Sequence, residues 1–120
     1  MTPTRADGYR ACIMVLDPNH VRTLITRIVE TLEPERVVLF GSHARGDAAP
    51  QSDVDLLVIA ESSRPRYERA IPVYRAIAGV PVEDDVMVYT PAEVRDWSCV
   101  DQAFVTTALR EGRILYERPG

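Results

Sequence analysis

The sequence predicts an α/β domain in which a small mixed β-sheet carries helices mainly on one face and exposes a group of carboxylates on the other. Three observations predict this class. Short runs rich in β-branched residues alternate with segments whose apolar residues recur every three or four positions, as strands alternate with helices. The 120 residues are the length of one domain. Apolar residues make up 46% of the chain, which is enough for a core.

The first helix is predicted directly after an N-terminal segment without a clear pattern. Residues 1–18 are treated as that segment, of undetermined structure, and residues 19–120 as a single domain. Asp17 or Asn19 is the predicted helix cap, and the helix should end near Glu33, just before a proline. Three charged side chains are expected to face water: Arg22, Arg27 and Glu30. The apolar positions have helical spacing: Val21, Leu24, Ile25, Ile28, Val29 and Leu32.

Three apolar runs are predicted strands. Residues 37–40 form a short buried strand closed by Gly41, after which a strand-to-helix turn and about one turn of helix are expected. Residues 48–52 are predicted to be a loop. Residues 53–60 begin polar and become wholly apolar, and residues 82–89 form the third strand.

Residues 62–79 indicate a helix that Pro72 must kink or split. Its arginines, with only Glu68 between them, form either a solvated helix face or a contact surface for an acidic partner or nucleic acid. These arginines are Arg64, Arg66, Arg69 and Arg75. One side of the helix collects Tyr67, Ala70, Ile71, Tyr74, Ile77 and Ala78.

Two further helices and an edge strand complete the prediction. The T-P-A-E run at residues 90–93 is a helix start, with a threonine cap, proline at the first position and glutamate three residues after the cap. Residues 100–111 indicate a last helix, which Gly112 ends. Residues 114–116 indicate a short edge strand.

Composition excludes several classes of protein. The chain has 18 acidic and 14 basic residues, a net charge of -4, and every basic residue is arginine. The absence of lysine excludes a phosphate-loop lysine, a Schiff-base lysine and a Ser–Lys dyad. No run approaches the ~18 apolar residues of a membrane span, and the polar residues 1–8 do not form a signal peptide. Cys12 and Cys99 are too few for a disulfide framework, so we expect a cytoplasmic protein. The acidic balance argues against nucleic acid as a partner.

Asp53 and Asp55 are the first candidate site residues. Strand side chains alternate between faces, so these two carboxylates project on one side with Cα atoms roughly 6–7 Å apart. Like charges so close repel, and divalent cations are the natural counter-charge, with two ions ~3.5–4 Å apart sharing the carboxylates. The alternative is that Asp53 caps a turn and Asp55 faces water. The fully apolar run at residues 56–59 disfavours that alternative, because it predicts a strand buried on both faces.

The strand at residues 82–89 supplies candidates for a third carboxylate. Apart from Asp84, the strand face that holds Val82, Val86 and Val88 is apolar and is expected to face the core. This favours Asp85, on the other face, as the partner of the aspartate pair and leaves Asp84 as the second choice. The alternative is that the acidic run at residues 83–85 is only a solvated strand entrance. One face holds Glu83, Asp85, Met87 and Tyr89, and the other holds Val82, Asp84, Val86 and Val88.

The turn after the first strand is a candidate phosphate site. Gly41 permits a close backbone approach or a positive φ, and Ser42 is a good helix cap with N–H groups that attract anions. Arg45 could pair with phosphate. The alternative is an ordinary capped helix. A catalytic pair of Ser42 with His43 is rejected, because adjacent turn residues seldom face each other.

These residues together resemble a known family. Gly41-Ser42, a gap of ten residues and Asp53-Val54-Asp55 resemble the GSx10DxD signature of the polymerase-β-like nucleotidyltransferases. The greatest similarity is to the minimal nucleotidyltransferases, many of which are encoded beside a HEPN-domain ribonuclease toxin. The strings G-S-H-A-R-G-D-A-A-P-Q-S-D-V-D-L-L-V, D-V-M-V-Y-T-P-A-E-V and E-G-R-I-L-Y-E carry the resemblance, which covers about residues 20–117.

The resemblance implies a nucleotidyltransferase fold and transfer of a nucleoside monophosphate, AMP from ATP, to a hydroxyl, with pyrophosphate leaving. It implies that Asp53 and Asp55 hold two Mg²⁺ ions and that Asp85 binds the catalytic ion and helps to deprotonate the acceptor. Gly41 and Ser42 would seat the β- and γ-phosphates.

The implied acceptor is a tyrosine of a partner HEPN toxin, which would make the protein an enzymatic antitoxin. Two alternatives stay open. One is a nucleotidyltransferase that modifies a small molecule such as an antibiotic, for which a homo-oligomer would complete the acceptor pocket. The other is an antitoxin that neutralises its toxin by contact alone.

Overall fold

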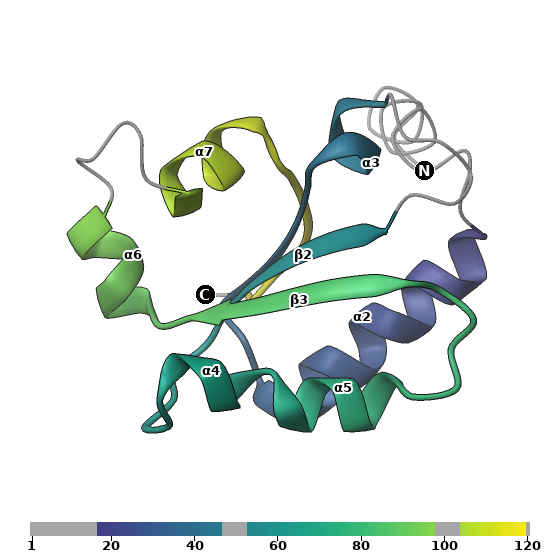
Figure 1. The fold of residues 1–120 in the computed structure, drawn as a ribbon, viewed down its shortest axis with the longest axis horizontal. Coiled ribbons are helices and arrows are strands. Elements are labelled where there is room, and N and C mark those ends of the chain that lie inside the picture. The colour runs from purple at the N-terminus through teal and green to yellow at the C-terminus, as the bar shows by residue number, and fades with distance from the viewer. Residues whose placement is uncertain (1–16, 47–52, 98–103, 120) are drawn as a thin grey trace.

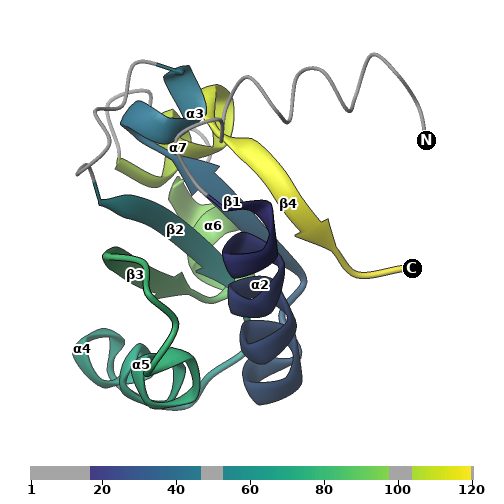
Figure 2. The ribbon, with the colours of Figure 1, turned by 90° about the vertical axis from the view of Figure 1, so that its right-hand side faces the viewer.

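The computed structural model describes residues 17–46, 53–97 and 104–119, which form a four-stranded mixed sheet in the order β3-β2-β1-β4 (Figures 1 and 2). β1 (Arg36–Phe40) runs antiparallel to both β2 (Val54–Ile59) and β4 (Arg113–Glu117). β3 (Asp84–Tyr89) is parallel to β2. The predicted α/β class and small mixed sheet are therefore confirmed.

One face of the sheet packs on α2 (Pro18–Leu32) and α5 (Ile71–Ile77), as Figure 2 shows for α2. α2 begins as predicted, because the Asp17 side chain accepts a hydrogen bond from the Asn19 N–H at 2.8 Å. It ends at Glu33, whose N–H still donates to the Val29 carbonyl at 2.9 Å and whose positive φ of 48° turns the following chain out of the helix. The buried side chains of this layer are Val21, Leu24 and Ile28 from α2 and Val73 and Ile77 from α5.

Arg27 was expected to face water, and this expectation is wrong. Its Nη1 donates to the carbonyl oxygens of Ala76 and Ala78, both at 3.2 Å. These carbonyls lie at the C-terminal end of α5, where a helix exposes unpaired acceptors and negative partial charge. Arg27 therefore fastens α2 to the end of α5.

The second face is partly covered by α6 (Pro91–Trp97) and α7 (Phe104–Glu111), at the end of the sheet where β3 finishes (Figure 1). The predicted capping box starts α6: the Glu93 N–H donates to Thr90 Oγ1 at 3.2 Å and the Thr90 N–H donates to Glu93 Oε1 at 2.9 Å. Val94 and Ala108 then pack against Val38, Leu57 and Ile59.

The helix predicted at residues 62–79 is split into α4 (Arg66–Arg69) and α5, with Pro72 in the first turn of α5. The apolar side expected for this segment faces the core only in part: Ile77 is buried and Ala70 packs against the core, but its other large side chains do not. Tyr67 is 82% exposed, Ile71 42% and Tyr74 39%, whereas Val73 and Ile77 are buried. Because the helix restarts at Ala70, the positions before and after the break do not share one continuous buried stripe.

Several expectations fall outside the described residues. These are the structure of residues 1–16, the loop at 48–52 and the start of the helix expected at residue 100. Among described elements, β3 begins at Asp84 rather than at Val82, and β4 is longer than the predicted edge strand. No described helix has the length and apolar character to cross a membrane.

Candidate active site

The backbone at Gly41 lies directly against a carboxylate. Gly41 follows β1 with φ 75° and ψ -154°, a conformation that only glycine adopts readily. A Cβ built at this position would overlap Asp55 Oδ2 and lie 3.3 Å from Asp55 Cγ. The close approach expected of this glycine is therefore present, and it is an approach to Asp55.

The turn leads into the short helix α3 (Ser42–Arg45), whose N-cap is Gly41 without a side-chain capping bond, so the expectation that Ser42 caps the helix is wrong. The Arg45 N–H donates to the Gly41 carbonyl at 3.1 Å, and the Gly46 N–H donates to the Ser42 carbonyl at 3.0 Å. His43 and Ala44 are buried, Ser42 is half-buried and Arg45 is exposed. The complete burial of His43 was not predicted. No local pattern marks it, because it depends on how α3 lies on the sheet.

Strand register brings two of the candidate carboxylates side by side. Asp55 in β2 is paired with Asp85 in β3 and, on its other side, with Phe40 in β1. Since side chains alternate along strands, Asp55 and Asp85 project from the same face. Asp84 is in register with the buried Val54 and belongs to the opposite face. The structure therefore places Asp85, rather than Asp84, beside Asp55.

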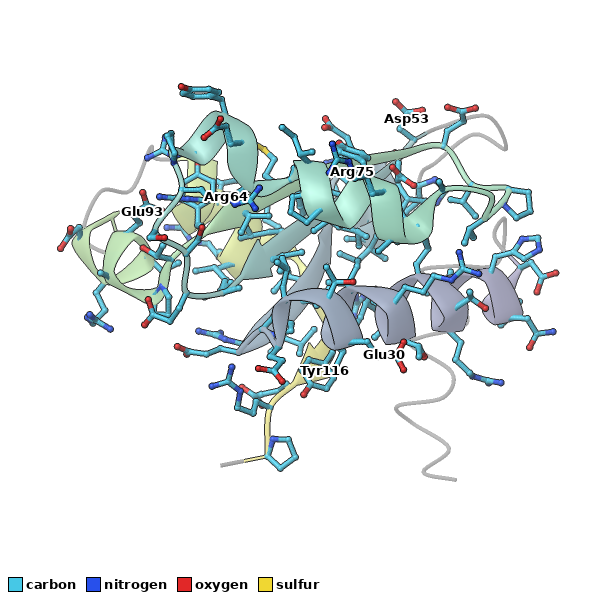
Figure 3. All side chains as sticks on the ribbon, turned by 90° about the horizontal axis from the view of Figure 1, so that it is seen from below. Glu30, Asp53, Arg64, Arg75, Glu93 and Tyr116 are labelled. Atoms are coloured by element: carbon cyan, nitrogen blue, oxygen red, sulfur yellow. The ribbon has the colours of Figure 1, made fainter. Side chains whose placement is uncertain are left out.

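Asp53 is an exposed residue two positions before Asp55, at the end of the sheet near the start of β2 (Figure 3). Burial raises the pKa of the Asp55 carboxyl, and the negative charges of Asp85 and Asp53 raise it further, against opposing effects of His43 and Arg45. The pKa of Asp84 is also raised, first by burial and then by the neighbouring carboxylates Glu83, Asp53 and Asp85. This end of the sheet thus concentrates negative charge that a cation would relieve.

Tyr74 of α5 reaches around the outer edge of β3 to the same site. Its hydroxyl accepts a hydrogen bond from the Val86 N–H at 2.8 Å and lies 3.5 Å from Asp85 Oδ1, to which it donates a weaker bond. The pKa of Tyr74 is raised, mainly by burial. Sequence reasoning missed this contact, because nothing in a helical tyrosine indicates which strand edge it meets.

The donor set fits a hard divalent cation, because carboxylate oxygens are the ligands that Mg²⁺ prefers. Within the described ranges, no three His, Cys, Asp or Glu side chains are gathered closely enough to hold a metal ion by themselves. Mg²⁺ commonly keeps waters and takes substrate phosphate oxygens in addition to one or two carboxylates. The aspartates could therefore supply part of a coordination shell that a nucleotide completes.

Two of the four arginines in the predicted basic stretch form ion pairs within the protein, and the remaining two are exposed. Arg69 Nη1 lies 2.6 Å from Glu93 Oε1, and Arg66 lies 3.5 Å from Glu93 Oε2 and 4.7 Å from the centre of the Tyr89 ring. Burial tends to raise the pKa of Glu93, but the Arg69 hydrogen bond, the Thr90 N–H and both arginines lower it to about 2. This pairing joins α4 to α6, and Arg64 and Arg75 remain exposed.

Known proteins similar to this chain were found by sequence and by structure. The family model for the nucleotidyltransferase domain matches residues 21–115. A protein of Methanocaldococcus jannaschii named "Putative protein adenylyltransferase" is 28% identical over 89 residues, covering 68% of this chain and 78% of that protein. The crystal structure of a "putative nucleotidyltransferase" from Sulfolobus solfataricus superposes with a TM-score of 0.56 at 23% identity, covering 82% of this chain and 84% of the other. The structural similarity supports the fold.

Proposed function

The chain belongs to the nucleotidyltransferase domain family, and we propose on this premise that it transfers AMP from ATP to a hydroxyl group, with pyrophosphate leaving. The observation that carries the proposal is the pairing of Asp55 with Asp85 on one face, with the Gly41 backbone against Asp55. Nucleotidyl transfer depends on positioning and on neutralisation of charge more than on covalent help from the protein. This arrangement supports positioning, and cations held by its carboxylates would supply the neutralisation.

Each site residue has a proposed role. Asp53 and Asp55 would hold two Mg²⁺ ions, and Asp85 would bind the ion nearest the acceptor. These ions would supply the positive charge that neutralises the phosphates and the leaving pyrophosphate. Asp85 also accepts the proton of the acceptor hydroxyl. Gly41 and Ser42 would seat the β- and γ-phosphates, as the resemblance to the minimal nucleotidyltransferases implies. Glycine is required at residue 41 because a Cβ there would overlap Asp55.

The proposed acceptor is a tyrosine hydroxyl on a partner protein, a HEPN-domain toxin, so that the chain acts as an enzymatic antitoxin. The name of the Methanocaldococcus relative supports a protein as acceptor. The genetic pairing with a toxin rests on the resemblance of the Gly41–Asp55 signature to the minimal nucleotidyltransferases.

The test is incubation with α-labelled ATP, Mg²⁺ and the protein encoded by the adjacent gene, which the proposal requires to be a HEPN-domain protein. We expect label on that protein, lost with chelator and in Asp53→Asn. Asp85→Asn should reduce labelling by about 100-fold or more, as expected for a group that contacts the reacting atoms. Asp84→Asn is the matched control and should stay within about threefold of wild type, because Asp84 lies on the opposite face. Equal effects of the two substitutions would contradict the assignment. Full neutralisation of the toxin by Asp53→Asn, without label, would favour an antitoxin that acts by contact.

A further inference from the structure

Three large apolar side chains lie along the exposed side of α4 and α5. Tyr67, Ile71 and Tyr74 are 82%, 42% and 39% exposed; Ile71 and Tyr74, three residues apart, share one side of α5, and Tyr67 lies in α4 just before the helix restarts. We call these three residues the α4–α5 stripe. Single exposed apolar residues are normal, but apolar side chains that gather on one surface mark an interaction site.

The charge around the α4–α5 stripe differs from that of the chain. Residues 62–78 contain four arginines and one glutamate, in a chain whose net charge is -4. Arg66 and Arg69 are paired with Glu93. In the part of the chain that the structure describes, the exposed side chains of Arg64 and Arg75 form no ion pair. Figure 3 shows both on the side of the molecule that α4 and α5 present. Two positive charges therefore remain available to a partner.

The stripe is continuous with the candidate active site through Tyr74. The Tyr74 hydroxyl is 3.5 Å from Asp85 Oδ1, and the remaining two stripe residues precede it on the same segment. A protein that brings a hydroxyl to Asp85 from the outer edge of β3 would therefore cover Tyr74. A small-molecule acceptor would need no such surface.

We propose that the α4–α5 stripe binds the acceptor protein, whose own surface presents apolar side chains and carboxylates around the accepting tyrosine. This inference rests on the proposed nucleotidyl transfer. Apolar contact explains Ile71, and carboxylates complement Arg64 and Arg75. A nucleic acid fits less well, because it would leave the exposed Ile71 without an apolar partner.

The experiment uses the whole chain and two short peptides that each carry one tyrosine between leucines, flanked by glutamates in one peptide and by lysines in the other. With labelled ATP and Mg²⁺, we expect a KM about tenfold lower for the acidic peptide, and loss or reversal of this preference in Arg75→Glu. Arg113→Glu, at the opposite edge of the sheet, is the matched charge control and should keep the preference.

A second pair of variants tests the contribution of the apolar side chains to acceptor binding. Ile71→Ala should raise the KM for both peptides about three- to tenfold, with kcat and the Kd of Mg²⁺–ATP unchanged. Ile114→Ala should not, although Ile114 on β4 is similarly exposed at 45%.

Other outcomes would overturn the inference. They are equal KM values for the two peptides, equal effects of the paired variants, or preferential labelling of an oligoadenylate RNA. If Mg²⁺–ATP raises the Tm of the wild type but neither peptide is labelled, the docking surface is refuted and nucleotide binding stands. If Mg²⁺–ATP does not raise the Tm at all, the proposed function itself fails, and this inference fails with it.

Discussion

Gly41→Ala should abolish AMP transfer because the new side chain displaces the Asp55 carboxylate, in addition to straining the backbone. The substitution places a side chain at φ 75°, which costs about 1–3 kcal/mol for a residue other than glycine. Its Cβ would also overlap Asp55 Oδ2, so the carboxylate must move. A displacement of about 1 Å at a reacting centre can reduce activity about 100-fold, which is about 2.7 kcal/mol of transition-state stabilisation.

Gly79→Ala is the matched control for this prediction. Gly79 has φ 92°, so alanine is strained there as well, but a Cβ at Gly79 would meet no heavy atom within 4 Å. Gly79→Ala should therefore lose about 1–3 kcal/mol of unfolding free energy, a fall in Tm of about 4–12 °C, and Gly41→Ala should lose more, because its Cβ also displaces Asp55. Only Gly41→Ala should lose AMP transfer, whereas Gly79→Ala should stay within about threefold of wild type.

The assays are thermal unfolding, calorimetric binding of Mg²⁺–ATP and the rate of label transfer. A double variant separates the two costs further. Once Asp55→Ala has removed the carboxylate, adding Gly41→Ala should lower stability by the backbone cost alone and should reduce transfer little more. If Gly41→Ala and Gly79→Ala showed the same transfer rate, the reasoning that the turn positions Asp55 would be refuted.

Three further predictions follow from the electrostatics of the molecule. Glu93→Gln should destabilise the protein by about 1–2 kcal/mol at neutral pH, allowing for partial exposure of the side chain. Because the pKa of Glu93 is lowered from 4.5 to about 2, this contribution is complete above about pH 4.5 and should vanish from unfolding curves as pH falls through about 2. Asp55→Asn should abolish transfer and raise the Tm of the nucleotide-free protein, since a carboxyl with a raised pKa lowers stability once it ionises. The Tm difference from wild type should shrink toward acid pH, where Asp55 is protonated. A Tm below that of the wild type at neutral pH would contradict the raised pKa of Asp55. Mg²⁺–ATP at 100 times the Kd of the wild type should stabilise the wild type by about 2.7 kcal/mol. At the same concentration, a shift of equal size in Asp53→Asn would argue against a role for Asp53 in binding.

The features that the sequence predicts well are those that local spacing determines. The helix from Pro18 and the start of α6 follow from caps and apolar periodicity within a few residues. The placement of Asp85 beside Asp55 is less local, because it needs the parallel pairing of β3 with β2. Alternation along β3 nevertheless separates Asp85 from Asp84, since only Asp85 is on the face opposite the buried Val86.

The features that the sequence does not predict depend on contacts between distant segments. Arg27 looks like a solvated helix residue until α5 brings its terminal carbonyls within 3.2 Å. The exposure of Tyr67 and Ile71 depends on how the helix restarts before Pro72, which apolar spacing alone does not determine. The contact of Tyr74 with Asp85 likewise requires the position of a helix relative to a strand edge.

The bond between Tyr74 and the Val86 N–H affects more than one side chain, because β3 is an outer strand of the four described. Unpaired N–H groups on such a strand are a template to which another polypeptide can add as a further strand. The phenol occupies one of these donors at mid-strand, which interrupts that template. The candidate active site beside Asp85 can therefore stay open to an acceptor while the edge of β3 resists pairing with a strand of a second copy of the chain.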